Sequence, residues 1–213
     1  MSTALPRLHA ITDERIARRS DLDDIARDLA NAGGSELAFH ARGRQLSGRE
    51  HYDLAVRLSV YQTPSPRSGQ AVRLFVNDRL DVALAVPASG VQLGRGSLSV
   101  SAARALNPRW WIGKSVHDLA EAEAARTEGA DYLVVGPVYA TASHPGRRPL
   151  GLKRLQAIVV AMGDLPVIAI GGITGDRVPA IRKAGVYGIA AIRAFWDDAE
   201  PAEAARRMRE WMS

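Results

Sequence analysis

A buried apolar segment that ends in two glycines sets the strongest constraint on the fold of this chain. Residues 165–174 read LPVIAIGGIT, so four apolar residues follow a proline and stop at Gly171 and Gly172. A run of this length between proline and glycine is typical of a strand buried on both faces, as in parallel sheets covered by helices. A helical pattern follows over residues 176–184, and its first turn can direct backbone N–H groups at an anion. We therefore expect a strand, a phosphate-binding turn and a helix, although two glycines can also form an ordinary turn without a ligand.

The next segment repeats this arrangement. Residues 188–192 read GIAAI and predict another buried strand, and Arg193 stands at its C-terminal end. In a (β/α)8 barrel the loops after strands 7 and 8 frequently form a phosphate site. A cation beside the second of these loops favours phosphate binding by the glycine turn over a turn without a ligand.

The alternation of strands and helices extends along the whole chain. Expected strands cover residues 8–12, 36–41, 72–76, 90–93, 110–116, 131–135, 167–170 and 188–192. Helical spacing separates them over residues 22–32, 80–86, 102–106, 118–128, 152–162, 176–184 and 200–212, and Ser47 with Glu50 has the spacing of a capping box at the start of one more helix. Eight such units predict a (β/α)8 TIM barrel, with residues 1–213 as a single domain. The alternative is an open doubly wound sheet, but no glycine follows the first strand as a dinucleotide-binding turn would require.

Composition excludes several classes of function. The chain has 213 residues and no cysteine, so a disulfide framework and thiolate chemistry are excluded. No apolar run approaches the roughly 18 residues of a membrane span, and the N-terminus is unlike a signal peptide, so we expect a cytoplasmic protein without membrane contact. The net charge of +5 comes from dispersed arginines. This pattern fits a solvated basic surface or attraction of anionic small molecules, whereas nucleic-acid binding would require a clustered basic stripe with aromatics.

Polar residues at the predicted C-terminal ends of the strands are the candidate site, because active sites of (β/α)8 barrels lie there. Arg42 and Arg44 follow the second strand and suit a phosphate or pyrophosphate, since guanidinium groups bind such oxygens in pairs. His40 shares a strand face with Arg42. The full set is Asp13, His40, Arg42, Arg44, Asn77, Asp78, Gln92, Lys114, Ser115, His117, Thr141, Ser143, His144 and Arg193.

Three of these positions allow competing interpretations. Ser115 is expected inside the barrel mouth rather than Lys114, because a lysine is costly to bury without a partner. Asp78 can bind Mg²⁺, bond to Arg79 or cap the following helix. His144 lies in the long loop of residues 136–151, where it can carry a proton near neutral pH or simply be exposed.

Several motifs from the first strand nearly to the C-terminus resemble the thiamine phosphate synthase / TenI family. They are LHAITDE, VNDRLDVAL, GVQLGRGSLS, IGKSVHDLAEAEAA, GADYLVVGPVYAT, PVIAIGGIT and AEPAEAARR. The resemblance implies a (β/α)8 barrel that acts in thiamine biosynthesis, and barrels of this family are often dimeric, so a homodimer is possible. The implied ligand is a phosphorylated thiazole held by Gly171, Gly172, Arg193 and Ala194.

In the synthase branch the resemblance implies Mg²⁺-dependent joining of a pyrimidine pyrophosphate to a thiazole phosphate, with release of pyrophosphate. Asn77 and Asp78 match the family's Asn-Asp pair, and Asp78 would be the metal ligand. Elsewhere the chain departs: His40 and Arg44 replace a glutamine and a lysine, and Ser97 replaces a second metal-binding aspartate. Thr141, Ser143 and His144 stand where the synthases have Thr-x-Thr-Lys, so a lysine is missing there too.

The TenI branch looks closer, because His40 with Arg42 and the segments around GVQLGRGSLS and SVH resemble it. Its active members are thiazole tautomerases, which move a proton and need no metal or other cofactor. Some of them have a catalytic histidine where this chain has Pro137. The leading hypothesis is therefore a thiazole tautomerase with His40 or His144 as proton carrier, and with substrate contacts from Arg42, Arg44, Asn77, Asp78, Ser115, Thr141 and Ser143. A synthase and a non-catalytic regulator that binds thiazole phosphate are the alternatives.

Overall fold

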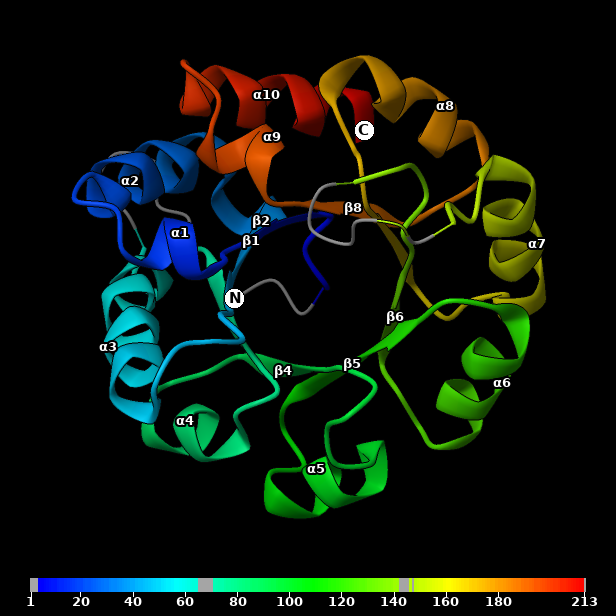
Figure 1. The fold of residues 1–213 in the computed structure, drawn as a ribbon, viewed down its shortest axis with the longest axis horizontal. Helices are drawn as coiled ribbons and strands as arrows, with labels where there is room; N and C mark the ends of the chain where they lie inside the picture. Colours follow the sequence, from blue (N-terminus) through cyan, green and yellow to red (C-terminus); the bar gives the residue numbers. More distant parts are fainter. Residues whose placement is uncertain (1–3, 65–70, 142–145, 147, 213) are drawn as a thin grey trace.

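The chain forms a closed barrel of eight parallel strands in sequence order (Figure 1). The structure, a computed structural model, describes residues 4–64, 71–141, 146 and 148–212. β1 pairs with both β2 and β8, which closes the sheet and confirms the predicted (β/α)8 barrel. The strands are β1 Leu8–Ile11, β2 Leu37–Ala41, β3 Arg73–Asn77, β4 Gly90–Leu93, β5 Trp111–Val116, β6 Tyr132–Val135, β7 Val167–Ile170 and β8 Gly188–Ala191.

Helices form a ring around the barrel (Figure 1). The expected ones are α2 Leu22–Gly33, α3 Gly48–Ser59, α4 Leu80–Ala85, α5 Val100–Leu106, α6 Leu119–Thr127, α7 Leu152–Met162, α8 Val178–Lys183 and α10 Pro201–Met212. α8 is shorter than predicted, because a 3-10 turn, Gly175–Arg177, precedes it. None of the helices within the described ranges is long and apolar enough to cross a membrane.

Two four-residue helices, α1 Glu14–Ala17 and α9 Arg193–Trp196, were not expected from the sequence. Each is a single turn, too short for helical spacing to reveal. Asp13 caps α1 by accepting a hydrogen bond of 2.9 Å from the backbone N–H of Ile16. This candidate site residue therefore orders the loop after β1 and does not line the cavity described below.

The barrel interior is filled by one layer of side chains that includes aromatic rings. Phe75 and Tyr132 are fully buried there with apolar residues from neighbouring strands. Gly113 makes room for the tyrosine, since a Cβ at this position would lie 2.2 Å from the Cζ atom of Tyr132. This packing fills the barrel interior, and the cavity described below opens at the end where the strands finish.

The capping box predicted at α3 is present. The Ser47 hydroxyl accepts from the backbone N–H of Glu50 at 3.2 Å, and the Glu50 carboxylate accepts from the backbone N–H of Ser47 at 2.8 Å. We expect Ser47→Ala to lower the free energy of unfolding by about 1 kcal/mol, measured by urea denaturation, because the backbone N–H of Glu50 loses its acceptor. Ser59→Ala at the other end of α3 is the control, and an equal loss there would contradict the assignment.

Candidate active site

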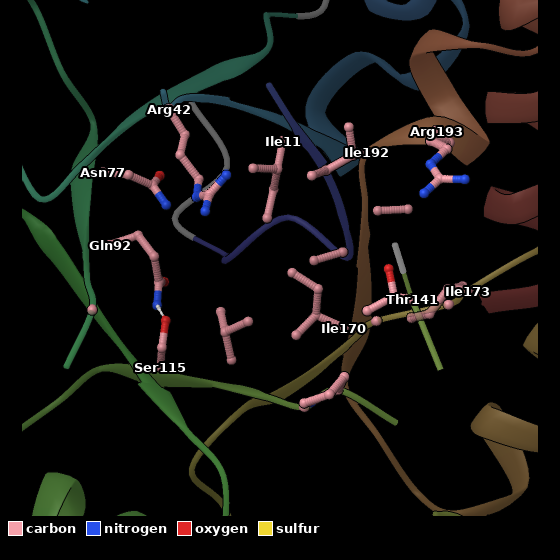
Figure 2. Close-up of a pocket in the computed structure, with 18 of the residues that line it drawn as sticks. Ile11, Arg42, Asn77, Gln92, Ser115, Thr141, Ile170, Ile173, Ile192 and Arg193 are labelled. Carbon is pink, nitrogen blue, oxygen red and sulfur yellow. Dashed lines mark hydrogen bonds between the residues drawn. The ribbon is translucent and has the colours of Figure 1, made fainter. Parts of the chain in front are cut away.

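A cavity of about 560 Å³ opens at the carboxyl ends of the strands. Figure 2 shows Arg42, Asn77, Gln92 and Ser115 on one side of it, and three isoleucines with Thr141 and Arg193 on the other. Asp78 is the one carboxylate among the described residues that line the cavity. Against it stand five arginines, so the cavity is built to hold anions: Arg42, Arg44, Arg95, Arg177 and Arg193.

The two glycines after β7 form a turn that only glycine can adopt easily. Gly171 and Gly172 have φ angles of 99° and 63°. A Cβ on Gly172 would lie 2.5 Å from the carbonyl oxygen of Ala140, and the Gly171 carbonyl accepts from the backbone N–H of Tyr139 at 3.0 Å. The turn is thus pressed against the segment after β6, and its bare backbone lines the cavity. This geometry fits the predicted phosphate turn.

Arg193 and Arg177 flank the glycine turn. The Arg177 guanidinium donates to the Gly172 carbonyl at 2.6 Å and lies over the Tyr139 ring, 4.6 Å from its centroid. Arg193 begins α9, and its guanidinium has no ion-pair partner among the described residues. Figure 2 shows Arg193 on the same side of the cavity as Thr141 and Ile173. Ala194, expected beside them, instead packs against the outer core and does not line the cavity.

Arg42 lies on the other side of the cavity, where hydrogen bonds between its backbone and Thr12 fix its position. The Thr12 hydroxyl accepts from the Arg42 N–H at 2.9 Å and donates to the Arg42 carbonyl at 2.8 Å. Burial and the nearby positive charge of Arg44 both lower the pKa of Arg42. An anion in the cavity would offset this repulsion between the guanidinium groups of Arg42 and Arg44. The sequence analysis did not identify Thr12, because its partner Arg42 is thirty residues away and no local pattern indicates this contact.

His40 does not reach the cavity, which corrects its expected role as a proton carrier. The side chain is fully buried and stacks on Phe75, with ring centroids 5.0 Å apart. Its Nε2 lies 2.8 Å from His9 Nδ1, and its Nδ1 lies 3.0 Å from Asn77 Oδ1. Both ring nitrogens are therefore occupied by protein. His144 and Ser143, the other expected proton carrier and a substrate contact, lie outside the described residues.

His117 lines the cavity, although the sequence analysis assigned no role to it. Its Nδ1 and its backbone N–H lie 2.8 and 2.9 Å from Glu121 Oε2. Arg95, another lining residue, pairs with the second oxygen of Glu121. Burial alone would raise the pKa of Glu121, but hydrogen bonds from His117 and Arg95 hold this pKa below its ordinary value. The four-residue spacing of His117 and Glu121 was the available signal, since such residues meet at the start of a helix.

Asp78 adopts an unusual backbone conformation that directs its carboxylate toward the loop after β4. Its φ is 62°, and its Oδ1 accepts from the Gly94 N–H at 2.8 Å and from the Ser97 hydroxyl. Asp78 neither caps α4 nor bonds to Arg79, which pairs with Asp81 at 2.9 Å. These two alternatives for Asp78 are therefore wrong.

The described lining of the cavity offers Mg²⁺ one carboxylate, that of Asp78. The described part of the chain contains no group of three acidic, histidine or cysteine side chains that could hold a metal. Mg²⁺ is commonly bound through one or two carboxylates together with substrate phosphates. The second carboxylate oxygen of Asp78 has no partner among the described residues. Gly94 leaves room for the carboxylate, since a Cβ at position 94 would come within 2.9 Å of Asp78 Oδ1. The site therefore fits an ion that arrives with a diphosphate.

Ser115 faces the cavity as predicted. Its hydroxyl accepts from Gln92 Nε2 at 3.0 Å, and both residues line the wall (Figure 2). Lys114 points away and donates to the Gly94 carbonyl at 3.1 Å. The alternation of a strand, together with the cost of burying a lysine, was enough to make this distinction.

Together, the fold and the cavity define a (β/α)8 barrel in which the loops after the strands surround a cavity lined by five arginines. Residues 8–195 match the family model described as thiamine monophosphate synthase. The chain belongs to this family, which the resemblance in its motifs predicted, and it is an enzyme.

Named relatives share most of their length with this chain. A "Putative thiamine-phosphate synthase 2" of Aquifex aeolicus is 37% identical over 90% of this chain and 98% of its own. A "Thiamine-phosphate synthase" of Methanoculleus marisnigri is 40% identical over 95% and 93%. The solved structure of a thiamine phosphate pyrophosphorylase from Pyrococcus furiosus superposes with a TM-score of 0.81 at 32% identity, covering 97% of this chain and 95% of that one. These names favour the synthase alternative and give no support to a closer relation to TenI.

Proposed function

We propose that this chain is a thiamine-phosphate synthase, which joins a pyrimidine diphosphate to a thiazole phosphate and releases pyrophosphate. The observation that carries the proposal is a single cavity with two groups of cations on different loops. Arg42 and Arg44 follow β2, while Arg177 and Arg193 follow β7 and β8. A diphosphate and a phosphate together carry more negative charge than the carboxylate and phosphate of a tautomerase substrate, so two pairs of arginines favour the synthase. The burial of His40 also disfavours one of the two alternative proton carriers of the tautomerase hypothesis.

The reaction breaks a carbon–oxygen bond to pyrophosphate and forms a carbon–nitrogen bond to the thiazole ring. Negative charge develops on the leaving pyrophosphate, and preorganised cations stabilise such charge. Arg42 and Arg44 supply these cations, and Asp78 would hold the Mg²⁺ that arrives with the diphosphate. When bound there, the ion would supply positive charge to the leaving group. The phosphate of the thiazole is held by Gly171, Gly172 and Arg193. Between the two groups of arginines the cavity has an apolar wall, formed by Ile11, Ile170 and Ile192.

The deciding experiment measures pyrophosphate release and thiamine phosphate formation by the purified protein with both substrates and Mg²⁺. We expect turnover that stops when either substrate is omitted or when EDTA removes the metal. Conversion of a carboxylated thiazole phosphate without pyrophosphate release would favour the tautomerase. Binding of thiazole phosphate with no turnover of either kind would favour the regulator.

Arg193 is expected to contribute mainly to binding of the thiazole phosphate. Arg193→Gln should raise KM for this substrate by about tenfold, because a charge-assisted hydrogen bond to a phosphate is lost at the exposed cavity mouth. KM for the pyrimidine diphosphate should change little. Arg182→Gln on the exposed surface of α8 is the matched control. Equal changes in KM for both substrates would contradict the placement of the phosphate beside Arg193.

A further inference from the structure

A chain of hydrogen bonds runs from the lower end of the barrel to the cavity wall. His9 Nε2 lies 2.9 Å from the carbonyl oxygen of Pro6, His9 Nδ1 lies 2.8 Å from His40 Nε2, and His40 Nδ1 lies 3.0 Å from Asn77 Oδ1. Both histidines are fully buried, whereas Asn77 is 7% exposed and lines the cavity (Figure 2). The end of the Asn77 amide that does not meet His40 is therefore the end available to a ligand.

Counting hydrogens fixes the direction of this chain when both histidines are neutral. The Pro6 carbonyl can only accept, so His9 must carry its hydrogen on Nε2 and has a bare Nδ1. His40 must then donate from Nε2, which leaves its own Nδ1 bare. Asn77 can satisfy that bare nitrogen only with its NH2 group, because a carbonyl oxygen facing a lone pair forms no bond. In this state the amide is turned over and its oxygen faces the cavity.

Addition of one proton to the histidine pair reverses the orientation of the Asn77 side-chain amide. If His9 carries hydrogens on both nitrogens, it donates to Pro6 and to His40 Nε2, and His40 donates from Nδ1 to Asn77 Oδ1. The structure has Oδ1 next to His40, which is the amide orientation that the anion-bound protein would have, whatever hydrogens the two rings carry. The NH2 group of Asn77 then faces the cavity. The chain thus has two fully bonded states, which differ by one proton and by whether Asn77 offers an acceptor or a donor.

The surroundings of the pair favour the neutral state when the cavity holds no anion. Burial lowers the pKa of His9 to about 4, and burial together with His9 and Arg42 lowers the pKa of His40 well below its ordinary value. The other groups packed against the pair are the rings of Phe75 and Tyr132, and burial raises the pKa of Tyr132, so it carries no charge. Arg42 is therefore the charged group that an anion in the cavity would offset.

We infer that His9 and His40 are positioning residues that set the polarity of Asn77 toward the ligand, and that a phosphate or diphosphate anion bound against Asn77 draws one proton onto the pair. The inference rests on the proposed function only in that the cavity accepts such an anion. Affinity for the anion then increases as the pH falls, because the bound state holds more protons than the free state.

Nitrogen-15 NMR of the histidine rings tests the ligand-free state directly. We expect His9 and His40 in wild-type protein at neutral pH to be neutral, with hydrogen on Nε2 and a bare Nδ1. Hydrogen on Nδ1 of His40 in the ligand-free protein would overturn the inference. This measurement needs neither turnover nor a ligand, so it separates failure of the inference from failure of the proposed function.

Calorimetry with inorganic pyrophosphate in buffers of different ionisation enthalpy tests the coupling. We expect wild type to take up about one proton more on binding than His9→Phe, because a neutral His40 in the variant can donate from Nδ1 with no added proton. His51→Gln, at a buried histidine whose Nε2 bonds to the Ala41 carbonyl at 2.9 Å, should match wild type. Equal proton uptake by wild type and a folded His9→Phe would overturn the coupling. If His9→Phe does not fold, ring signals of wild type with pyrophosphate decide, since they must show hydrogen on both nitrogens of one histidine.

Discussion

Replacement of Asp78 by asparagine is expected to lower kcat/KM for pyrophosphate release on the order of a hundredfold to a thousandfold, as for loss of one preorganised charge-stabilising group. Asparagine tolerates the left-handed backbone that residue 78 adopts, with φ of 62°, and its oxygen can still accept from the Gly94 N–H. The variant therefore removes the charge while it keeps the loop. The concentration of Mg²⁺ needed for half-maximal rate should rise at the same time.

The matched control is Asp81→Asn. Asp81 lies three residues along the chain, pairs with Arg79 at the surface and does not line the cavity. Its replacement should leave both kcat/KM and the Mg²⁺ requirement near their wild-type values. If Asp78→Asn retained wild-type rates and an unchanged Mg²⁺ requirement, Asp78 could not be the group that holds the metal, and the proposed synthase would need another ligand.

Gly172→Ala is expected to damage stability and binding together. The added Cβ meets the Ala140 carbonyl oxygen at 2.5 Å in a backbone with φ of 63°. Overpacking and the unfavourable φ should together lower the free energy of unfolding by about 2–4 kcal/mol, measured by urea denaturation. Displacement of the turn should also raise KM for the thiazole phosphate by roughly tenfold or more, since positioning errors near 1 Å can cost a hundredfold.

Gly163→Ala separates the two causes. Gly163 ends α7 with φ of 60°, but nothing lies within 4 Å of a Cβ there. Only the φ penalty of about 1 kcal/mol applies, and KM should stay unchanged. Equal losses of stability in the two variants, with no change in KM for Gly172→Ala, would show that contact between the glycine turn and the segment after β6 does not shape the phosphate site.

Side-chain direction along single strands was predictable from the sequence. The choice of Ser115 over Lys114 for the barrel mouth needed only the alternation of β5 and the cost of burying a lysine, and the glycine turn after β7 needed only the end of an apolar run. The capping box of α3 was equally local. In each case the interacting groups lie within a few residues of one another, so spacing alone fixes the geometry.

Depth within the barrel was not predictable in this way. Alternation placed His40 and Arg42 on one face of their strand, yet His40 is fully buried and does not line the cavity, although Ile11, its partner in the strand register, does. Its partner His9 comes from β1, and its third neighbour Asn77 comes from β3. Which inward-facing residue reaches a ligand depends on how adjacent strands are staggered when the sheet closes.

The sequence by itself therefore determined the barrel, the order of its strands and helices, and the family, because each follows from patterns within short segments. Only the tertiary structure decided which polar residues form the cavity wall and which lie beneath it. In the folded chain His117 lines the cavity and is fixed by Glu121. His40, which was expected to carry a proton, is instead a buried neighbour of Asn77. The physical reason is that hydrogen-bond partners from different strands meet only after the sheet has closed.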